Sequence, residues 1–142
     1  ALAALLLAAA LAGHGWVASR CARLLGRARV AAESGAIDAA ADLARRAAAV
    51  RPDDPGPHAF LAQLVLAERA GERAWREEGE AAASRALALD RESAILHYTR
   101  SLYYDWSGEP APAYRERLAA HLLYPLKPLY RARGSGGGEA PP

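Results

Sequence analysis

The chain has 142 residues, of which 52% are hydrophobic, and this is enough to build one domain around a modest core. Its formal net charge is +2, and Cys21 is its only cysteine, so an internal disulfide and a cysteine-pair metal site are both excluded. Four arginines between residues 20 and 29 carry the excess positive charge, because the chain from Val30 onward has 14 basic and 16 acidic residues. This slightly acidic balance disfavours nucleic-acid binding.

The first 19 residues are free of charge. They show no polar face, and His14 is the only interruption of the apolar stretch. Nineteen helical residues measure about 28 Å, which is close to the roughly 30 Å of a bilayer core. Trp16 lies near the end of the stretch, where an indole ring would meet the membrane interface. We therefore predict a transmembrane helix over residues 1–19. In the alternative, this segment is the buried first helix of the domain that follows.

A basic flank follows this apolar segment. Arg20, Arg23, Arg27 and Arg29 come in succession with no acidic residue among them. Positive charge marks the cytoplasmic side of a membrane span, so we expect a bacterial inner-membrane location with the rest of the chain in the cytoplasm. A cleaved signal peptide is not expected, because such peptides carry their basic residues before the apolar core and not behind it.

The strongest pattern in the chain is an internal repeat. Four residues recur 73 positions later in the same order and at the same spacing, with Gly35, Ala40, Ala47 and Pro52 matching Gly108, Ala113, Ala120 and Pro125. Glycine tolerates the left-handed conformation at a helix C-terminus, alanines seven residues apart share one helix face, and proline ends a helix. Runs of β-branched residues are nearly absent, so strands are not expected. The pattern predicts antiparallel helix pairs that approach closely through small residues.

This unit resembles the tetratricopeptide repeat (TPR), whose length is about 34 residues. The resemblance implies an all-α fold of three helix-pair repeats, within a repeat domain over residues 20–133. The units cover residues 21–54, 55 to 92 or 93, and 94–127. The middle unit is irregular: Ala86 takes the place of Ala47, and Gly79 fills the small-residue position. About five extra residues are expected between its two helices, within residues 69–76.

A search for catalytic or ligand-binding chemistry finds no convergent set of residues. The four histidines have no spacing that places two of them on one helix face with a carboxylate between. Neither a nucleophile elbow nor a phosphate-binding glycine loop is present, and the glycine-rich residues 134–142 read as a disordered tail. The Glu77-Glu78-Glu80 run is expected on a solvated helix face. We therefore expect no enzymatic activity, cofactor, metal or small-molecule substrate for this chain.

The TPR resemblance implies a groove, formed by the first helix of each unit, that takes a peptide or a partner helix. TPR domains that hold a C-terminal carboxylate use lysine and asparagine on this face. The present chain has no asparagine, and its only lysine is Lys127, past the last repeat, so carboxylate binding is not expected. The repeat register assigns the candidate partner-binding positions to Arg29, Gln63, Tyr98, Leu102, Asp105 and Trp106.

Two alternatives apply to the third unit. Tyr98, Leu102 and Trp106 are four residues apart and share one helix face, and exposed Tyr and Trp side chains dominate binding hot spots. Alternatively, a capping helix that contains Leu126, Leu129 and Tyr130 packs over this stripe, because terminal repeats need a cap.

The sequence as a whole predicts a membrane-tethered protein-interaction or assembly module with no catalytic activity of its own. The alternative is that the chain is the C-terminal cytoplasmic tail of a polytopic glycan enzyme. An apolar span, a basic flank and alanine-rich repeats together resemble the tail of bacterial O-antigen ligase and polymerase proteins. In that case the catalytic part lies upstream of Ala1.

Overall fold

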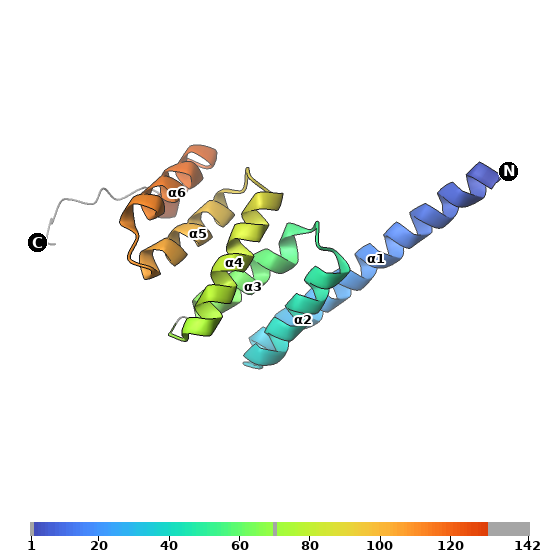
Figure 1. The fold of residues 1–142 in the computed structure, drawn as a ribbon, viewed down its shortest axis with the longest axis horizontal. Coiled ribbons are helices and arrows are strands. Elements are labelled where there is room, and N and C mark those ends of the chain that lie inside the picture. The colour runs from blue at the N-terminus through green and yellow to red at the C-terminus, as the bar shows by residue number, and fades with distance from the viewer. Residues whose placement is uncertain (1, 70, 131–142) are drawn as a thin grey trace, which may run out of the picture.

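The computed structural model describes the backbone of residues 2–69 and 71–130, and the side chains of these residues from Gly15 onward. The described residues form only helices, which confirms the predicted all-α fold class (Figure 1). The disordered tail predicted over residues 134–142 lies outside the described residues. The elements are α1 (Leu2–Glu33), α2 (Ile37–Val50), α3 (Pro55–Glu68), α4 (Arg73–Leu89), α5 (Ala94–Trp106), α6 (Pro110–Leu123) and a 3₁₀ turn, η1 (Pro128–Tyr130).

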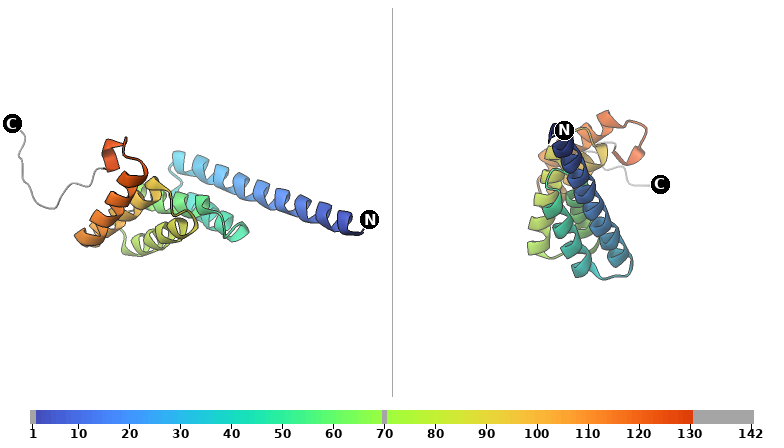
Figure 2. Two further views of the ribbon diagram at one scale, coloured as in Figure 1. Left: turned by 90° about the horizontal axis from the view of Figure 1, so that it is seen from above. Right: turned by 90° about the vertical axis from the view of Figure 1, so that its right-hand side faces the viewer.

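The helices pack as three consecutive antiparallel pairs. Helix α1 pairs with α2, α3 with α4, and α5 with α6, and the pairs stack through contacts of α2 with α3 and of α4 with α5 (Figure 1). The second unit begins at Pro55 and the third at Ala94, as the repeat register predicts. Figure 2 shows the stack from two further directions, with the N-terminal half of α1 extending beyond it.

In the first and third units, a turn that contains glycine joins the two helices of the pair. Gly35 has a φ of 78° and Gly108 a φ of 72°, in the left-handed region that favours glycine. In the first turn, the Gly35 amide donates to the Ala32 carbonyl and the Ala36 amide donates to the Ala31 carbonyl, both at 2.9 Å. An equivalent pair of bonds closes the turn at Gly108. These bonds satisfy the last carbonyls of the preceding helix, which explains why the glycine recurs.

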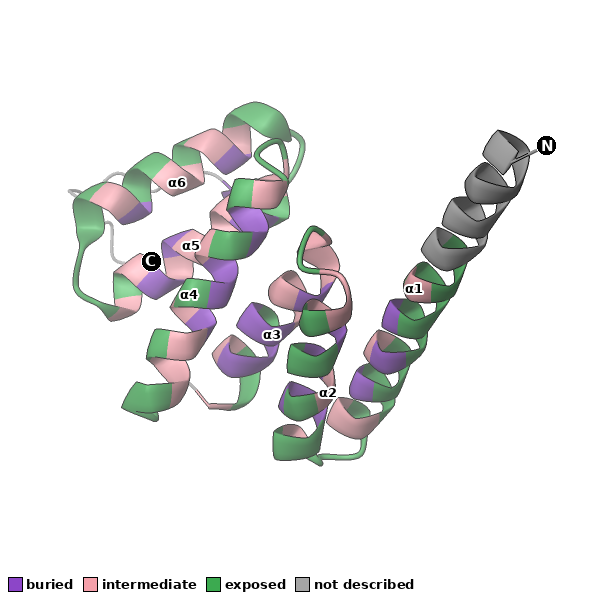
Figure 3. Ribbon diagram, turned by 45° about the vertical axis from the view of Figure 1, so that its right-hand side comes forward, coloured by how far each residue is buried: buried purple, intermediate pink, exposed green. Residues whose placement is uncertain are grey.

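The predicted small-residue stripe is buried where the paired helices meet. Its alanines have no exposed surface in either outer unit, and Figure 3 shows the buried residues on the sides of the helices that face one another. Helix α2 ends at Val50 and α6 at Leu123, shortly before the predicted prolines. The buried alanines are Ala40, Ala47, Ala113 and Ala120.

The middle unit departs from its neighbours mainly in its second helix. Helix α4 has 17 residues, whereas α2 and α6 have 14 each. The extra residues expected within 69–76 therefore mostly extend the start of α4, because the loop before it covers only residues 69–72. Gly79 and Ala86 are buried on α4, so the predicted register of this unit is confirmed.

The expected membrane span over residues 1–19 is not supported. Helix α1 runs without a break from Leu2 into the first repeat and ends at Glu33. Across the part of the chain that the structure describes, no helix combines the length and the apolar character that a membrane crossing requires. The side chains of residues 1–14 lie outside the described residues.

Candidate partner-binding face

The six candidate residues lie on the first helices of the three units, and we call this surface the first-helix face. Arg29 is on α1, Gln63 is on α3, and the other four are on α5. Local capping fixes the start of α3, because the Asp54 carboxylate accepts a hydrogen bond of 2.9 Å from the Gly56 amide and Pro55 occupies the first helical position. Arg29, Gln63 and Asp105 are exposed, whereas Tyr98, Leu102 and Trp106 are partly buried.

Tyr98 is covered by the C-terminal turn of the described chain. Its ring centroid lies 5.3 Å from that of Tyr130, at an interplanar angle of 47°. Tyr130 belongs to η1 and is only 2% exposed, and the Lys127 ammonium lies 5.5 Å from its ring centroid. The alternative in which residues after Pro125 cap the third unit is therefore correct in part: the segment that covers Tyr98 is a 3₁₀ turn, and it is not a helix. Leu126 and Leu129 do not contribute to it, because they are 83% and 57% exposed.

Trp106 and Asp105 are engaged within the chain. The Trp106 ring meets that of Tyr103 edge-on, with centroids 5.6 Å apart, and packs against the edge of the core. The Asp105 carboxylate forms an ion pair with the Arg117 guanidinium of α6. The predicted stripe therefore does not form one open aromatic surface. Arg29, Gln63 and the partly exposed side of Leu102 are the candidate residues that keep accessible surface without an ion pair or an aromatic partner.

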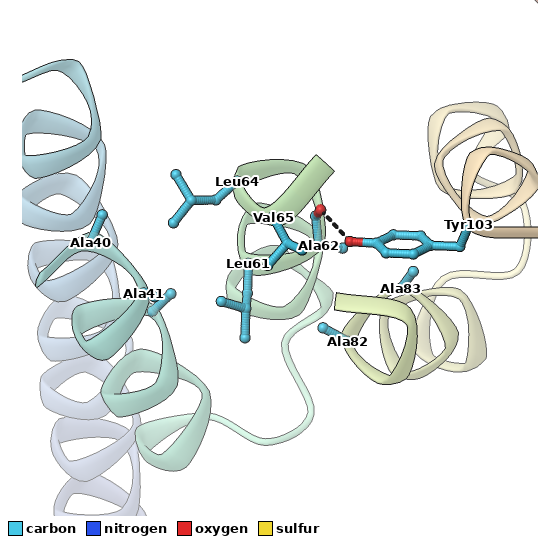
Figure 4. Packing of buried hydrophobic residues seen from close by; sticks show 10 residues of the cluster. Ala40, Ala41, Leu61, Ala62, Leu64, Val65, Ala82, Ala83 and Tyr103 are labelled. Atoms are coloured by element: carbon cyan, nitrogen blue, oxygen red, sulfur yellow. Dashed lines mark hydrogen bonds between the residues drawn. The ribbon is translucent and has the colours of Figure 1, made fainter. Parts of the chain in front are cut away.

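Tyr103 joins the third unit to the second. Its side chain has no exposed surface, and its hydroxyl donates a hydrogen bond of 2.7 Å to the Ala62 carbonyl of α3 (Figure 4). Burial, and to a lesser extent the Glu80 carboxylate, raises the pKa of the Tyr103 hydroxyl above its usual value. This side chain holds α5 at a fixed position against α3, and so sets the first-helix face of the two units.

The architecture is similar to solved structures of peptide-binding repeat domains. The second TPR domain of human RPAP3 in complex with an HSP70 peptide has a TM-score of 0.72 at 18% identity, over 80% of this chain and 91% of that one. The first TPR of Spaghetti (RPAP3), bound to an HSP90 peptide, also has a TM-score of 0.72, at 15% identity over 79% and 85% of the two chains. No protein-family model matches the chain, and no curated protein is similar to it in sequence.

A bacterial protein shows the same arrangement. The type III secretion chaperone SycD of Yersinia enterocolitica, in complex with a peptide of the translocator YopD, has a TM-score of 0.65 at 16% identity, over 77% of this chain and 79% of that one. The fold is that of a TPR domain. At these identities the similarity establishes the fold, and the binding chemistry has to come from the residues of this chain.

One cluster on the TPR stack was not predicted from the sequence. Two guanidinium groups lie over the ring of Trp75 on α4, that of Arg45 at 5.3 Å and that of Arg69 at 5.6 Å from the ring centroid. Arg45 also donates two hydrogen bonds to Glu78, at 2.6 and 2.8 Å, which lower the pKa of that carboxyl. Glu78 was expected on a solvated face, but here it ties the first TPR unit to the second.

A second polar cluster lies between α4, α5 and α6. His97 Nδ1 is 2.6 Å from a Glu116 carboxylate oxygen, and His97 Nε2 is 3.0 Å from the Arg91 carbonyl. Arg100 approaches the same carboxylate at 3.5 Å. Because both ring nitrogens are engaged, His97 acts as a linker between helices of the TPR stack. Within the described residues, no three His, Cys, Asp or Glu side chains are grouped as a metal site would require.

Proposed function

We propose that this chain is a protein-interaction module whose first-helix face binds a peptide segment or a helix of a partner protein. The observation that carries the proposal is the stack of three TPR units, in which Arg29 of the first and Gln63 of the second keep exposed side chains on the same face. Three similar structures, two TPR domains and a type III secretion chaperone, have bound peptides from HSP90, HSP70 and YopD. The module contributes binding and no catalysis.

The residues of the face indicate what kind of segment it takes. Arg29 offers a cation in the first unit, Gln63 offers an amide in the second, and Leu102 offers an apolar surface beside the covered Tyr98 in the third. Lysine and asparagine are absent from this face, so a C-terminal carboxylate finds no clamp. We infer that the partner segment is amphipathic, with an acidic residue over Arg29 and apolar residues over Leu102.

Co-purification of partners with variants of the full chain tests the proposal. Arg29→Glu and Gln63→Arg reverse or add charge at exposed positions, so we expect normal folding and loss of the bound protein. Arg46→Glu, at an exposed position on α2, is the matched control and should leave binding unchanged. Equal recovery of partners with all three variants would place the binding surface elsewhere and refute the proposal.

Membrane tethering and a bacterial inner-membrane location are a further part of this proposal, and they rest on sequence alone. The support is the charge-free stretch of residues 1–19 and the one-sided arginines after it. Alkaline phosphatase, which is active only after export, can be fused after Pro142. We expect an inactive fusion in the membrane fraction. Either an active fusion or a fully soluble one would contradict this part of the proposal.

The alternative, a C-terminal tail of an O-antigen ligase- or polymerase-type glycan enzyme, rests on the same arrangement of apolar segment, basic flank and repeats. In this alternative the module holds an assembly partner next to a catalytic membrane domain. The reading frame upstream of Ala1 separates the two: several apolar spans favour the enzyme tail, and a start codon within a few residues favours the single-anchor module.

A further inference from the structure

Helix α1 has one side that no described helix covers. Three exposed positions on this side correspond, in the repeat register, to positions of α3 that are buried inside the stack. The exposed residues are Arg23, Arg27 and Val30, and their counterparts are Pro57, Leu61 and Leu64. Figure 3 shows α1 at one end of the stack, with exposed residues along its outer side. This side of α1 is therefore the place where the second helix of a preceding unit would lie.

An apolar hollow lies in this side of the first unit, between α1 and α2. Its volume is about 510 Å³, and apolar groups form most of its wall. Val30 is 65% exposed, and no neighbouring atom lies within 4 Å of the place that a Cβ atom would take at Gly26. The hollow thus leaves room for apolar side chains of a docking segment. We call its lining residues the N-terminal end face; they are Arg23, Gly26, Arg27, Val30, Ala31 and Leu43.

The third unit shows what the same positions contain where a preceding unit is present. Arg100 of α5 corresponds to Arg27, and Glu116 of α6 corresponds to Leu43. The Arg100 guanidinium lies 3.5 Å from a Glu116 carboxylate oxygen, and the end of α4 borders the same site. In the first unit, Leu43 takes the place of the acidic residue. Within the described residues, neither Arg23 nor Arg27 forms an ion pair, so a helix that covers this end has to supply the acidic groups itself.

We propose that the N-terminal end face binds an amphipathic helix of a partner protein, one that carries acidic residues beside an apolar stripe. This helix takes the place that the second helix of the preceding unit has in the two later units. Its apolar side chains enter the hollow over Val30 and Leu43, and its carboxylates pair with Arg23 and Arg27. Arg20, three residues before Arg23 on the same side of α1, is exposed and extends the basic rim.

The charge and the shape of the face decide between possible occupants. In a second copy stacked end to end, the positions of α6 that face the next unit hold Tyr114, Arg117 and His121. None of these is acidic, so Arg23 and Arg27 would be covered without a neutralising partner, which is costly. An anionic membrane surface attracts arginines through charge alone. The hollow between the arginines adds a shape that a helix with protruding side chains fills and a flat layer of headgroups does not.

The N-terminal end face is separate from the first-helix face. Arg29 comes two residues after Arg27 and therefore points about 200° away from it around α1. A helix bound at the end face leaves Arg29 and Gln63 accessible. The inference consequently does not rest on the proposed function, and variants at Arg27 and Arg29 distinguish the two sites.

A fluorescent reporter on the end face tests the proposal with a defined ligand. Val30→Cys in a Cys21→Ala background gives the full chain, in a nonionic detergent, a single thiol for an environment-sensitive dye. The ligand is a synthetic helical peptide that repeats Leu-Glu-Ala-Glu-Leu-Ala-Ala. This peptide should shift the dye emission, and a counterpart with lysine in place of glutamate should not. The matched control is Leu122→Cys in the same background, because Leu122 is 73% exposed on α6, and its dye should not respond.

Charge-reversal variants of the labelled chain then locate the contact. Arg23→Glu/Arg27→Glu replaces two attractions by repulsions and should weaken binding of the acidic peptide by about tenfold or more. Arg29→Glu changes the first-helix face and should leave the affinity unchanged. If Arg29→Glu weakens binding and the double variant does not, the peptide lies on the first-helix face. That result overturns the end-face proposal and leaves the proposed function intact.

The same dye at residue 30 reports the other occupants. A shift when the chain is concentrated without peptide assigns the face to a second copy. A shift with micelles that contain phosphatidylglycerol, and none with the acidic peptide, assigns it to a lipid surface. Either result overturns the proposal, and so do equal responses to the two peptides, equal responses at residues 30 and 122, or no response to the acidic peptide.

Discussion

The ring of Tyr103 lies directly against the backbone of Gly79. A Cβ atom at residue 79 would come within 2.1 Å of the Tyr103 hydroxyl oxygen and within 2.9 Å of the Val65 Cβ. Because Gly79 has no side chain, Tyr103 of α5 can pass α4 and reach the Ala62 carbonyl of α3. One glycine and one tyrosine together define how the second and third units stack.

Gly79→Ala should destabilise the protein. Alanine favours a helix over glycine by about 1 kcal/mol, but overpacking against Tyr103 and Val65 costs typically about 1–3 kcal/mol or more. Because Val65 is itself fully buried, we expect the overpacking cost to exceed the helix gain, with a net loss of up to about 2 kcal/mol in urea unfolding. Gly26→Ala on α1 is the control, since nothing lies near its added methyl group, and it should stabilise. If Gly79→Ala and Gly26→Ala stabilised the protein equally, the close contact of Gly79 with Tyr103 would be contradicted.

Tyr103→Phe should cost about 1 kcal/mol, the typical contribution of one hydrogen bond. The pH dependence gives a sharper result. The pKa of Tyr103 is raised in the folded protein, so above pH 10 the unfolded chain releases this proton first. Stability then falls as the pH rises, by up to about 1.4 kcal/mol per pH unit for one group. The stability difference between wild type and Tyr103→Phe should shrink between pH 9 and 11. A constant difference would argue against a buried hydroxyl.

Ala113→Leu should destabilise by about 1–3 kcal/mol, because the residue is fully buried where α5 and α6 meet. Ala113→Arg should cost more, since it would also bury a charge. Ala111→Leu provides the matched control on the same helix, at an exposed position, and should leave the melting temperature nearly unchanged. Equal melting temperatures for the two leucine variants would mean that the repeat register is wrong.

The unit boundaries and the helix ends could be predicted because each depends on a local property of one residue type. Gly35 and Gly108 adopt positive φ, and the alanines fill positions with no room for a larger side chain. The Tyr103–Gly79 contact could not be predicted in this way. It joins residues of two different units, and its geometry depends on how α4 and α5 stack after the irregular loop.

The accessibility of the residues on the first-helix face could not be predicted either, because it also depends on contacts between separate segments of the chain. The register places Tyr98, Asp105 and Trp106 on the correct helix, but their availability depends on what else reaches them. Tyr130 reaches Tyr98 from a segment that follows the last repeat unit. Arg117 reaches Asp105 from α6, a helix that the register does place, but the repeat pattern specifies only the small residues of that helix and not this ion pair. A 3₁₀ turn of three residues carries no periodic signal in a sequence, so the cover on Tyr98 became visible only in the structure.

The Arg45–Glu78 pair should contribute a modest, salt-dependent stabilisation. Both side chains are partly exposed, so a double-mutant cycle with Arg45→Ala and Glu78→Ala should give a coupling of about 0.5–1 kcal/mol at low salt. Since Arg45 lowers the pKa of Glu78, this stabilisation is present above the unfolded pKa of the carboxyl. It should be lost as the pH falls through the folded pKa. A coupling that is unchanged at acidic pH would show that Glu78 is not the partner.

The most direct test of the central claim is site-specific photo-cross-linking from the first-helix face. A photoreactive amino acid at Gln63, which is exposed on α3, should form a cross-link to a partner protein when the full chain is expressed in its native cell. The same amino acid at Ala81, exposed on α4, should form none. Cross-links from Ala81 alone, or equal yields from both positions, would contradict a binding site on the first helices.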